Sequence, residues 1–315
     1  MSDTLTTTVQ VDPAISLYYD RALLEAARAE LVHEGLAQKR PIPAKSGNTI
    51  KFRRYANLSP ADTPLTEGVT PPGQALSKTD ITASISWYGD FVHVTDVVDI
   101  TGQDAELTVA SQKLGYQMGQ TRDKIVRDVM VSCASVSNAS HGSNGHTPTE
   151  ITKADIDAVV KTLLSANAKM TTPAVPAGGG QGTVPIRRAY WGIADTDLVD
   201  DLEKVTGFTA ASEYGDSGAS VDAEWGATGN VRWLVTSEGY VSSDTPAVYS
   251  LPILGRDAYG VTELTEAAAM NIIKPFGSAG TADPLNQRAS SGWKMAFVAR
   301  ILNDNFMHVL KVTHS

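Results

Sequence analysis

The alternation of hydrophobic and polar residues predicts two strands that are separated by a long loop. Every second residue from Ile81 to Trp87 is apolar and those between are polar, which predicts a half-buried strand over 81–95. Another strand is expected at 49–55. The roughly 25 residues between the two strands include four prolines, whereas hairpin loops usually have about 2 to 5 residues. We therefore interpret the two strands as the legs of a projecting loop.

The strongest helical pattern in the chain covers residues 105–136. Apolar or small residues recur there at intervals of three or four, namely Leu107, Ala110, Leu114, Met118, Thr121, Ile125, Val129 and Cys133. Charged residues such as Arg122 and Asp128 fall mostly off this line. At about 1.5 Å per residue the helix would be roughly 45 Å long, which suits a strut for the whole fold.

The rest of the chain mixes helices and strands. A polar arm at 1–13 precedes an expected helix at 15–32, and a capping box at Thr152 begins another helix. A short helix is expected in "TDLVDDLEKV", and strands are expected in "RRAYWGIA", "VRWLVTS", "AVYSLPIL" and "AAAMNIIKPF". The pattern near the C-terminus predicts two strands around a turn, in "MAFVARILNDNFMHVLKV". No regular βαβ order emerges, so the predicted fold class is α+β.

Composition excludes several classes of protein. A net charge of −9 and a pI near 5.1 argue against a dedicated nucleic-acid binder, which normally carries a basic excess. Cys133 is the only cysteine, so a disulfide framework and a cysteine-based zinc site are excluded. The N-terminus has no signal-peptide pattern, and no stretch approaches the roughly 18 apolar residues of a membrane span. We expect a soluble protein with no membrane partner.

One short motif suggests catalysis. Residues 215–218 spell Gly-Asp-Ser-Gly, which resembles the nucleophile loop of trypsin-type hydrolases and makes Ser217 a candidate nucleophile. A serine nucleophile also needs a histidine base that a carboxylate orients, and no histidine lies in a recognisable base motif. We favour a glycine-rich turn and no enzymatic activity, and keep a serine hydrolase centred on Ser217 as an alternative.

Two other clusters suggest ligands. His141 and His146 share a Gly/Ser/Asn loop, but a zinc site generally recruits further ligands at close spacing. The glycines at 178–182 lack the Lys-Ser/Thr pair of a phosphate-binding loop, so they are interpreted as part of a low-complexity connector at 171–185. We therefore predict no catalytic residue, no metal site and no cofactor.

What remains is a geometry suited to contact between copies of the chain: a polar arm, a long projecting loop and a long helix. Four ordered blocks resemble the major capsid protein family of tailed bacteriophages and prophages. The blocks are "KRPIPAKSGNTIKFRRYANLSPADTPLTEGVTP", "GATGNVRWLVTS", "GRDAYGVTEL" and "DPLNQRASSGWKMAFVARILNDNFMHVLKV". Together they extend over nearly the whole chain, from about residue 38 to the C-terminus, which makes them more specific than any single motif.

The resemblance implies the shell fold shared by tailed phages and herpesviruses, with five blocks along the chain. Residues 1–37 would form an N-terminal arm and 38–97 an extended loop with its base. Residues 98–149 would form a peripheral domain with a spine helix, and 150–258 an axial domain. Residues 259–315 would return to the peripheral domain, where the C-terminal strand pair would close the sheet beside the spine helix.

The resemblance also implies a function. The protein would assemble with itself into hexamers and pentamers that tile an icosahedral shell around double-stranded DNA, in a virion capsid formed in the host bacterial cytoplasm. Further expected partners are a separate scaffolding protein, a portal and a decoration protein, with only non-specific proximity to the packaged DNA. A phage-associated binding module is kept as an alternative, although such a module would show repeats, a signal peptide or cysteines.

The loop is the predicted contact between subunits. We expect it to lie over a neighbouring subunit, where Lys51, Arg53 and Arg54 would meet carboxylates and Glu67 near the tip would meet a basic partner. Lys45 and Lys51 would also be available for the side-chain crosslinks that some shells of this fold contain. That chemistry requires a buried, preorganised carboxylate, and none can be assigned from the sequence.

Overall fold

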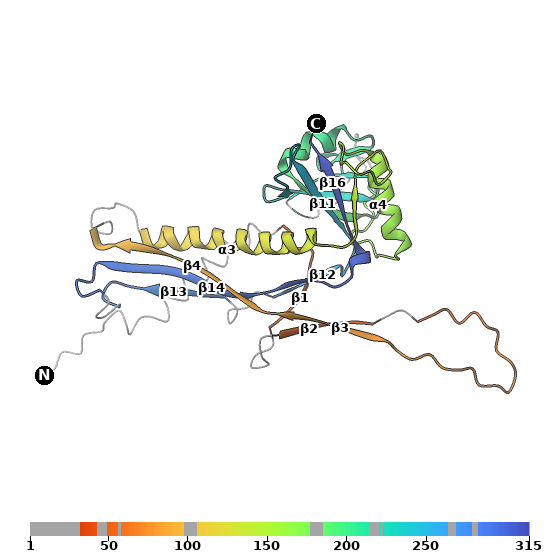
Figure 1. Cartoon of the computed structure of the whole chain (residues 1–315), viewed down its shortest axis with the longest axis horizontal. Helices are drawn as coiled ribbons and strands as arrows, with labels where there is room; N and C mark the ends of the chain where they lie inside the picture. Colours follow the sequence, from red (N-terminus) through yellow and green to blue (C-terminus); the bar gives the residue numbers. More distant parts are fainter. Residues whose placement is uncertain are drawn as a thin grey trace.

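The computed structural model describes nine segments of the chain, namely residues 32–42, 49–55, 58–97, 106–176, 185–214, 221, 223–263, 269–278 and 283–314. The arm before residue 32, the helix expected within it, Lys45 and Ser217 lie outside the described residues. Helices and strands are mixed as the α+β prediction requires. The molecule is elongated, with a long helix and a long sheet side by side and a loop that projects beyond them (Figure 1).

The long helix is α3, Glu106–Val131, and it confirms the predicted strut. It lies along an antiparallel three-stranded sheet in the order β13-β14-β4 (Figure 1). The bounds of these strands are Ala269–Lys274, Arg288–Phe297 and Ser86–Thr95. The core between helix and sheet is built on α3 by Leu114, Met118, Val126 and Met130, and on β14 by Trp293, Met295 and Phe297.

The buried stripe of α3 differs from the predicted one in its second half. Val126 and Met130 are fully buried, whereas Ile125 and Val129 are only partly buried. Arg122 and Asp123, of which Arg122 was expected off the apolar line, are also fully buried. Their partners are His33 and Glu34, which precede Arg122 and Asp123 by about ninety residues and therefore cannot be detected from a local periodicity.

The strand predicted over 81–95 is in fact two strands. β3, Lys78–Ser84, pairs only with β2, Thr49–Tyr55, and forms the base of the loop. β4 begins at Ser86 and pairs with β14 in the sheet below α3. Only Ile85 separates the two strands, so the period-two pattern continues unbroken while the hydrogen-bonded partner changes.

A second lobe contains an eight-stranded sheet in the order β5-β16-β11-β6-β9-β8-β7, with β10 also paired to β11. Its helices are α4, Lys153–Ser165, and α5, Val199–Lys204. The predicted capping box is confirmed at Thr152, where Asp155 is the N3 residue. Strand bounds in chain order are Val136–Asn138, Tyr190–Asp195, Phe208–Ala210, Glu224–Thr228, Val231–Thr236, Tyr240–Val241, Val248–Leu254 and, for β16, Met307–Thr313.

The two strands near the C-terminus do not form the expected pair beside α3. β15, Ala299–Ile301, joins a small sheet in the order β1-β12-β15, with β1 at Gln38–Arg40 and β12 at Tyr259–Thr262. β16 instead enters the eight-stranded sheet between β5 and β11. The short 3-10 turn Asp304–Phe306 carries the chain from one sheet to the other, so the C-terminal strand ties both lobes together.

A core substitution on α3 tests how much the fold depends on this helix. Met118 is fully buried, so Met118→Ala should lower the free energy of unfolding by about 2–5 kcal/mol, since truncation leaves a cavity against the sheet. Tyr116→Ala is the control on the same helix, because Tyr116 is 42% exposed. Denaturant unfolding of the isolated subunit gives both values. Equal losses in the two variants would show that this face of α3 does not carry the core.

Candidate assembly surface

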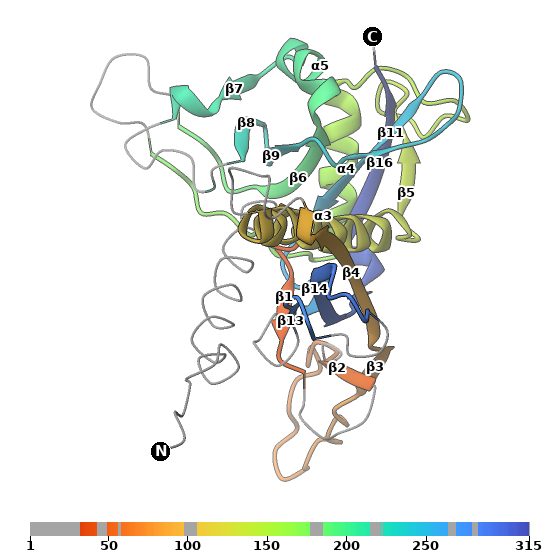
Figure 2. The ribbon, with the colours of Figure 1, turned by 90° about the vertical axis from the view of Figure 1, so that its left-hand side faces the viewer.

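The base of the projecting loop is anchored by the inner face of the β2–β3 ribbon. Ile50, Phe52 and Ala83 are buried on this face and pack against Leu302. Phe52 lies so close to β12 that a Cβ atom at Gly260 would come within 2.6 Å of its ring. The base is therefore fixed to the body of the molecule, whereas residues 58–80 beyond it are exposed (Figures 1 and 2).

The strand alternation divides the three basic residues of β2 between its two faces. Lys51 and Arg53 share the outer face, and the Arg53 Nε donates to Asp80 Oδ1, directly opposite on β3, at 2.9 Å. Arg54 lies on the other face, where its Nη1 donates to the Leu302 carbonyl at 3.3 Å. The basic cluster expected from the sequence is thus divided, and two of its members already have partners in the same subunit.

The Arg53–Asp80 pair alters the titration of both groups. The hydrogen bond from Arg53 lowers the pKa of Asp80 below the usual carboxyl range, and the same hydrogen bond raises the pKa of Arg53. Both side chains are well exposed to solvent, so the pair fixes the register of the ribbon more than it stabilises the fold.

Glu67 lies in the exposed outer part of the loop, in a turn closed by the hydrogen bond from Val69 N to the Thr66 carbonyl at 3.1 Å. Gly68 adopts a φ of 77°, which a residue with a side chain rarely does. Further back, the Gln74 side chain bridges the two legs, since its Oε1 accepts from Ser59 N and its Nε2 donates to the Ser59 carbonyl. The loop therefore has internal hydrogen bonds, although none of the other residues that the structure describes covers it.

Large apolar side chains on the loop were missed by the sequence analysis. Leu65 is 78% exposed, and Tyr55, Leu58, Val69 and Leu76 are also exposed. Solvent-facing loops normally hold polar residues, so five large apolar side chains in one loop indicate a surface that a partner covers. For Leu65 and Val69, the signal that could have revealed them is their position between Pro64 and Pro71, where no strand or helix is expected to bury them.

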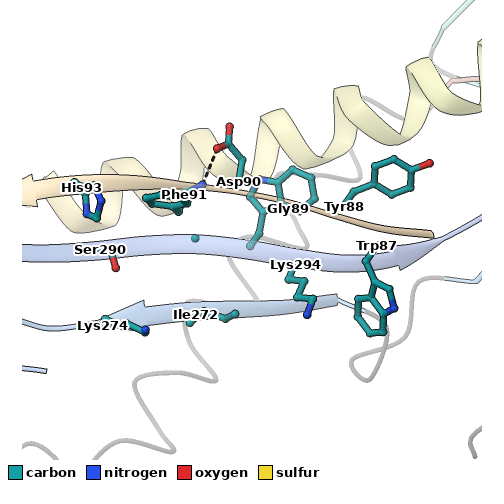
Figure 3. A pocket seen from close by; sticks show the side chains of 12 residues that line it. Trp87, Tyr88, Gly89, Asp90, Phe91, His93, Ile272, Lys274, Ser290 and Lys294 are labelled. Atoms are coloured by element: carbon teal, nitrogen blue, oxygen red, sulfur yellow. Dashed lines mark hydrogen bonds between the residues drawn. The ribbon is translucent and has the colours of Figure 1, made fainter. Parts of the chain in front are cut away.

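A second exposed apolar surface lies on the β13-β14-β4 sheet, on the face away from α3. Trp87 and Phe91 on β4 and Ile272 on β13 line a groove of about 510 Å³ there (Figure 3). Phe91 is 60% exposed, and Trp87, Met270 and Ile272 are exposed too. We call this surface the sheet groove.

The two faces of β4 have opposite roles. Asp90 points toward α3 (Figure 3) and accepts a hydrogen bond from the Gln117 amide, while the Gln117 carbonyl oxygen accepts from Trp293 Nε1. The alternate residues Trp87, Phe91 and His93 face the sheet groove. On one face of β4 the side chains contact α3, whereas on the other face they are exposed to solvent.

The sheet groove also carries positive charge. Lys274 and Lys294 line it, and the Lys294 ammonium lies 4.7 Å from the centre of the Trp87 ring. His93 stacks edge-on against Phe91 with ring centroids 4.9 Å apart. The groove is therefore apolar at its centre and basic at its margin, a combination that suits an apolar segment bearing carboxylates.

The other candidate chemistry finds no support among the described residues. They include no group of three or more potential metal ligands, and no described helix is long and apolar enough to cross a membrane. Asp195 caps the turn that precedes α5, where its side chain accepts from Asp197 N. His141 and His146 lie in the turn between β5 and α4.

Residues 78–312 match a family model that is described as a phage capsid protein. The chain belongs to the phage capsid protein family. No curated protein matches it. This capsid protein is thus a structural component of a virion shell and not an enzyme, as predicted from the sequence.

Solved structures share its fold at low sequence identity. The capsid of Ralstonia phage GP4 matches with a TM-score of 0.67 and 12% identity, over 89% of this chain and 87% of the other. The capsid of cyanophage P-SCSP1u matches with a TM-score of 0.60 and 13% identity, over the same shares. The SrpI encapsulin of Synechococcus elongatus PCC 7942 gives a TM-score of 0.55 and 8% identity, again over 89% and 87%. The predicted shell fold is confirmed.

The charge pair at the loop base can be tested by titration. Replacing Arg53 with Met should raise the Asp80 pKa toward its usual value, because the hydrogen bond that lowers it is lost. Since the folded pKa is depressed, the pairing is present above the usual carboxyl pKa and is lost as the pH falls through the lowered value. Carboxyl NMR titration measures the change. Lys51→Met is the control and should leave most of the shift; an Asp80 pKa that does not respond to Arg53→Met would refute the assignment.

Proposed function

We propose that this capsid protein assembles into hexamers and pentamers that tile an icosahedral shell around double-stranded DNA, and that the loop of each subunit covers the sheet groove of its neighbour. The observation that carries the proposal is the presence of two exposed apolar surfaces, the loop and the sheet groove, on opposite parts of one elongated subunit (Figure 1). The loop extends away from the end of the molecule where β4, β13 and β14 lie, so a second copy is the natural occupant.

This geometry favours closed rings. A contact between two different patches of identical subunits is heterologous, and its repetition about an axis generates a ring when the rotation closes. Rings of six and of five are the two capsomers that an icosahedral shell requires. The same loop and groove would serve both, since the loop is exposed and can change its direction without disturbing the packed core.

Charge supports the pairing of loop and sheet groove. Asp62 and Glu67 bring carboxylates to the outer loop, and Lys274 and Lys294 line the groove. Lys51 and Glu67 make no ion pair with any described residue of their own subunit, which leaves them available to a neighbour. Arg53 and Arg54 would contribute mainly by holding the base of the loop, because their partners are Asp80 and Leu302.

The strength of the shell would come from repetition. An exposed ion pair contributes only about 0–1 kcal/mol, but every subunit would engage two neighbours in its ring through the same contact. Burial of the loop's apolar side chains would add about 25 cal/mol per Å². Contacts of this strength allow a misplaced subunit to dissociate before the shell closes.

The finer division of the chain and its other partners also belong to this proposal. We assign residues 1–37 to the arm, 38–97 to the loop and its base, 98–149 to the peripheral domain, 150–258 to the axial domain and 259–315 to the return. A separate scaffolding protein, a portal and a decoration protein would complete the particle, which would assemble in the host cytoplasm. The net charge of −9 suits a shell that encloses DNA without binding it tightly.

Substitutions in the loop should separate folding from assembly. Leu65→Asp with Val69→Asp should reduce the yield of shells by about tenfold or more, because two carboxylates would enter an apolar groove. The isolated subunit should unfold at an unchanged temperature, since both side chains are exposed. Electron microscopy and size exclusion of the purified protein measure the shells. Leu164→Asp on α4, at an exposed site outside both surfaces, is the matched control.

Charge reversal identifies the partner surface. Glu67→Lys alone should lower the yield of shells, and adding Lys274→Glu and Lys294→Glu should restore part of it if the loop and the sheet groove meet. Normal shells from the Leu65/Val69 variant would refute the role of the loop. If Glu67→Lys lowers the yield of shells and the added groove substitutions restore none of it, the sheet groove is not the partner of the loop.

A further inference from the structure

Four ionisable side chains form a cluster that water does not reach, at the junction between the arm and α3. His33 is 1% exposed, Glu34 2%, and Arg122 and Asp123 are both 0% exposed. The first two lie in the turn before β1, and the other two are consecutive on α3. Ionisable residues are rarely buried to this degree in a core that hydrophobic residues could fill.

Two contacts hold the cluster together. The Asp123 carboxylate accepts from His33 N at 2.8 Å with one oxygen and contacts His33 Nδ1 at 2.6 Å with the other. The Arg122 Nη2 donates to Glu34 Oε1 at 2.6 Å. His33 and Glu34 are thus held to α3 by two contacts. Asp123 contacts His33 with both carboxylate oxygens, and Arg122 forms an ion pair with Glu34.

Neighbouring elements close the cluster from the other sides. The Tyr259 hydroxyl of β12 donates to the His33 carbonyl, and the Arg122 guanidinium lies 4.7 Å from the centre of the Phe297 ring of β14. The cluster therefore contacts the helix, the small sheet and the sheet below α3 at one point.

The cluster is incompletely satisfied. Glu34 Oε2 and Arg122 Nε and Nη1 are buried and have no hydrogen-bond partner among the residues that the structure describes. Burial raises the pKa of Glu34, although Arg122 opposes the shift, and burial lowers the pKa of Arg122. Removing two charges from water costs free energy that their attraction does not fully recover, so the closed arrangement is costly to maintain.

The cluster lies just before the segment that leads into the projecting loop. His33 and Glu34 are followed closely by β1 and then by the base of the loop. The loop therefore follows a short junction that these contacts hold to α3.

We propose that this buried cluster is a latch: residues 32–40 can release from α3 as a local unit while the rest of the subunit stays folded, and the closed latch sets the directions in which β1 and the base of the loop leave the spine helix. The importance of these directions rests on the proposed shell function, but the opening itself is a property of the single subunit. Charged residues suit such a latch because an ion pair has one preferred geometry, whereas an apolar contact tolerates sliding.

The latch has a specific response to pH. Because burial raises the pKa of Glu34, the closed form binds a proton more tightly than the open form, so acid favours closure and this contribution is lost as the pH rises through the raised pKa. The other charged or titratable groups that act on Glu34 are Arg122 and Asp123 on α3, Lys39 on β1 and Tyr259 on β12.

Hydrogen exchange on the free subunit tests the proposal. Arg122→Met leaves Glu34 buried without its cation, so the amides of residues 33–40 should exchange about tenfold faster or more at neutral pH, and increasingly so as the pH rises. Adding Glu34→Leu removes the remaining carboxylate of that pair, and should restore slow exchange and abolish most of the pH dependence. Amides in β11 and β16 should be unchanged in both variants.

The matched control is Arg232→Met, which removes a second buried arginine that faces a carboxylate, that of Glu224 at 3.4 Å, in the eight-stranded sheet. It should accelerate exchange in β8 and β9 and leave residues 33–40 unchanged. Unchanged exchange at 33–40 in Arg122→Met would overturn the latch. So would an equal acceleration throughout the subunit, because the cluster would then be an ordinary part of the core. Neither result depends on whether shells form, so a failure of the latch and a failure of the shell proposal remain distinguishable.

Discussion

The packing of α3 against the β13-β14-β4 sheet is the constraint on which the rest of the subunit depends. Met118, Met130 and Phe297 lie in one continuous core with residues of β11, β12 and β16, so the helix organises both lobes. Because this core occupies one face of the sheet only, the opposite face stays open. The exposed groove is therefore a direct result of how the core is built, and a neighbouring subunit can complete it as a second layer.

Local periodicity was sufficient where an element buries one face against its nearest layer. It predicted β2, β6, β9, β11 and the presence of α3, although this helix ends at Val131 and not at residue 136, and four blocks of sequence were sufficient to indicate the family. Local periodicity failed where the burial of a residue, or the partner of a strand, depends on residues far away in the sequence. Arg122 resembles a surface residue until Glu34 is placed beside it, and the change of partner at Ile85 leaves no trace in a period-two pattern.

The sequence predicted where the candidate surface lies, but not that its uncovered residues are mainly apolar. The basic residues of β2 drew attention to the loop, yet Arg53 and Arg54 are engaged within the subunit, and the apolar residues beyond them are what the subunit leaves uncovered. Charge clusters are conspicuous in a sequence, whereas single leucines and valines between prolines are not. Only the structure reveals that no described residue of the same chain shields them, and this exposure is the basis for proposing a contact surface.

The uninterrupted passage from β3 into β4 has a mechanical consequence. A single buried residue, Ile85, joins the loop base to the sheet below α3, so no flexible linker separates the two. A force applied at the loop tip would reach the sheet as a bending moment instead of being absorbed by a slack connection. A load on the loop would then strain the sheet below α3 elastically, and the stiffness of this short joint would help to set the compliance of the shell.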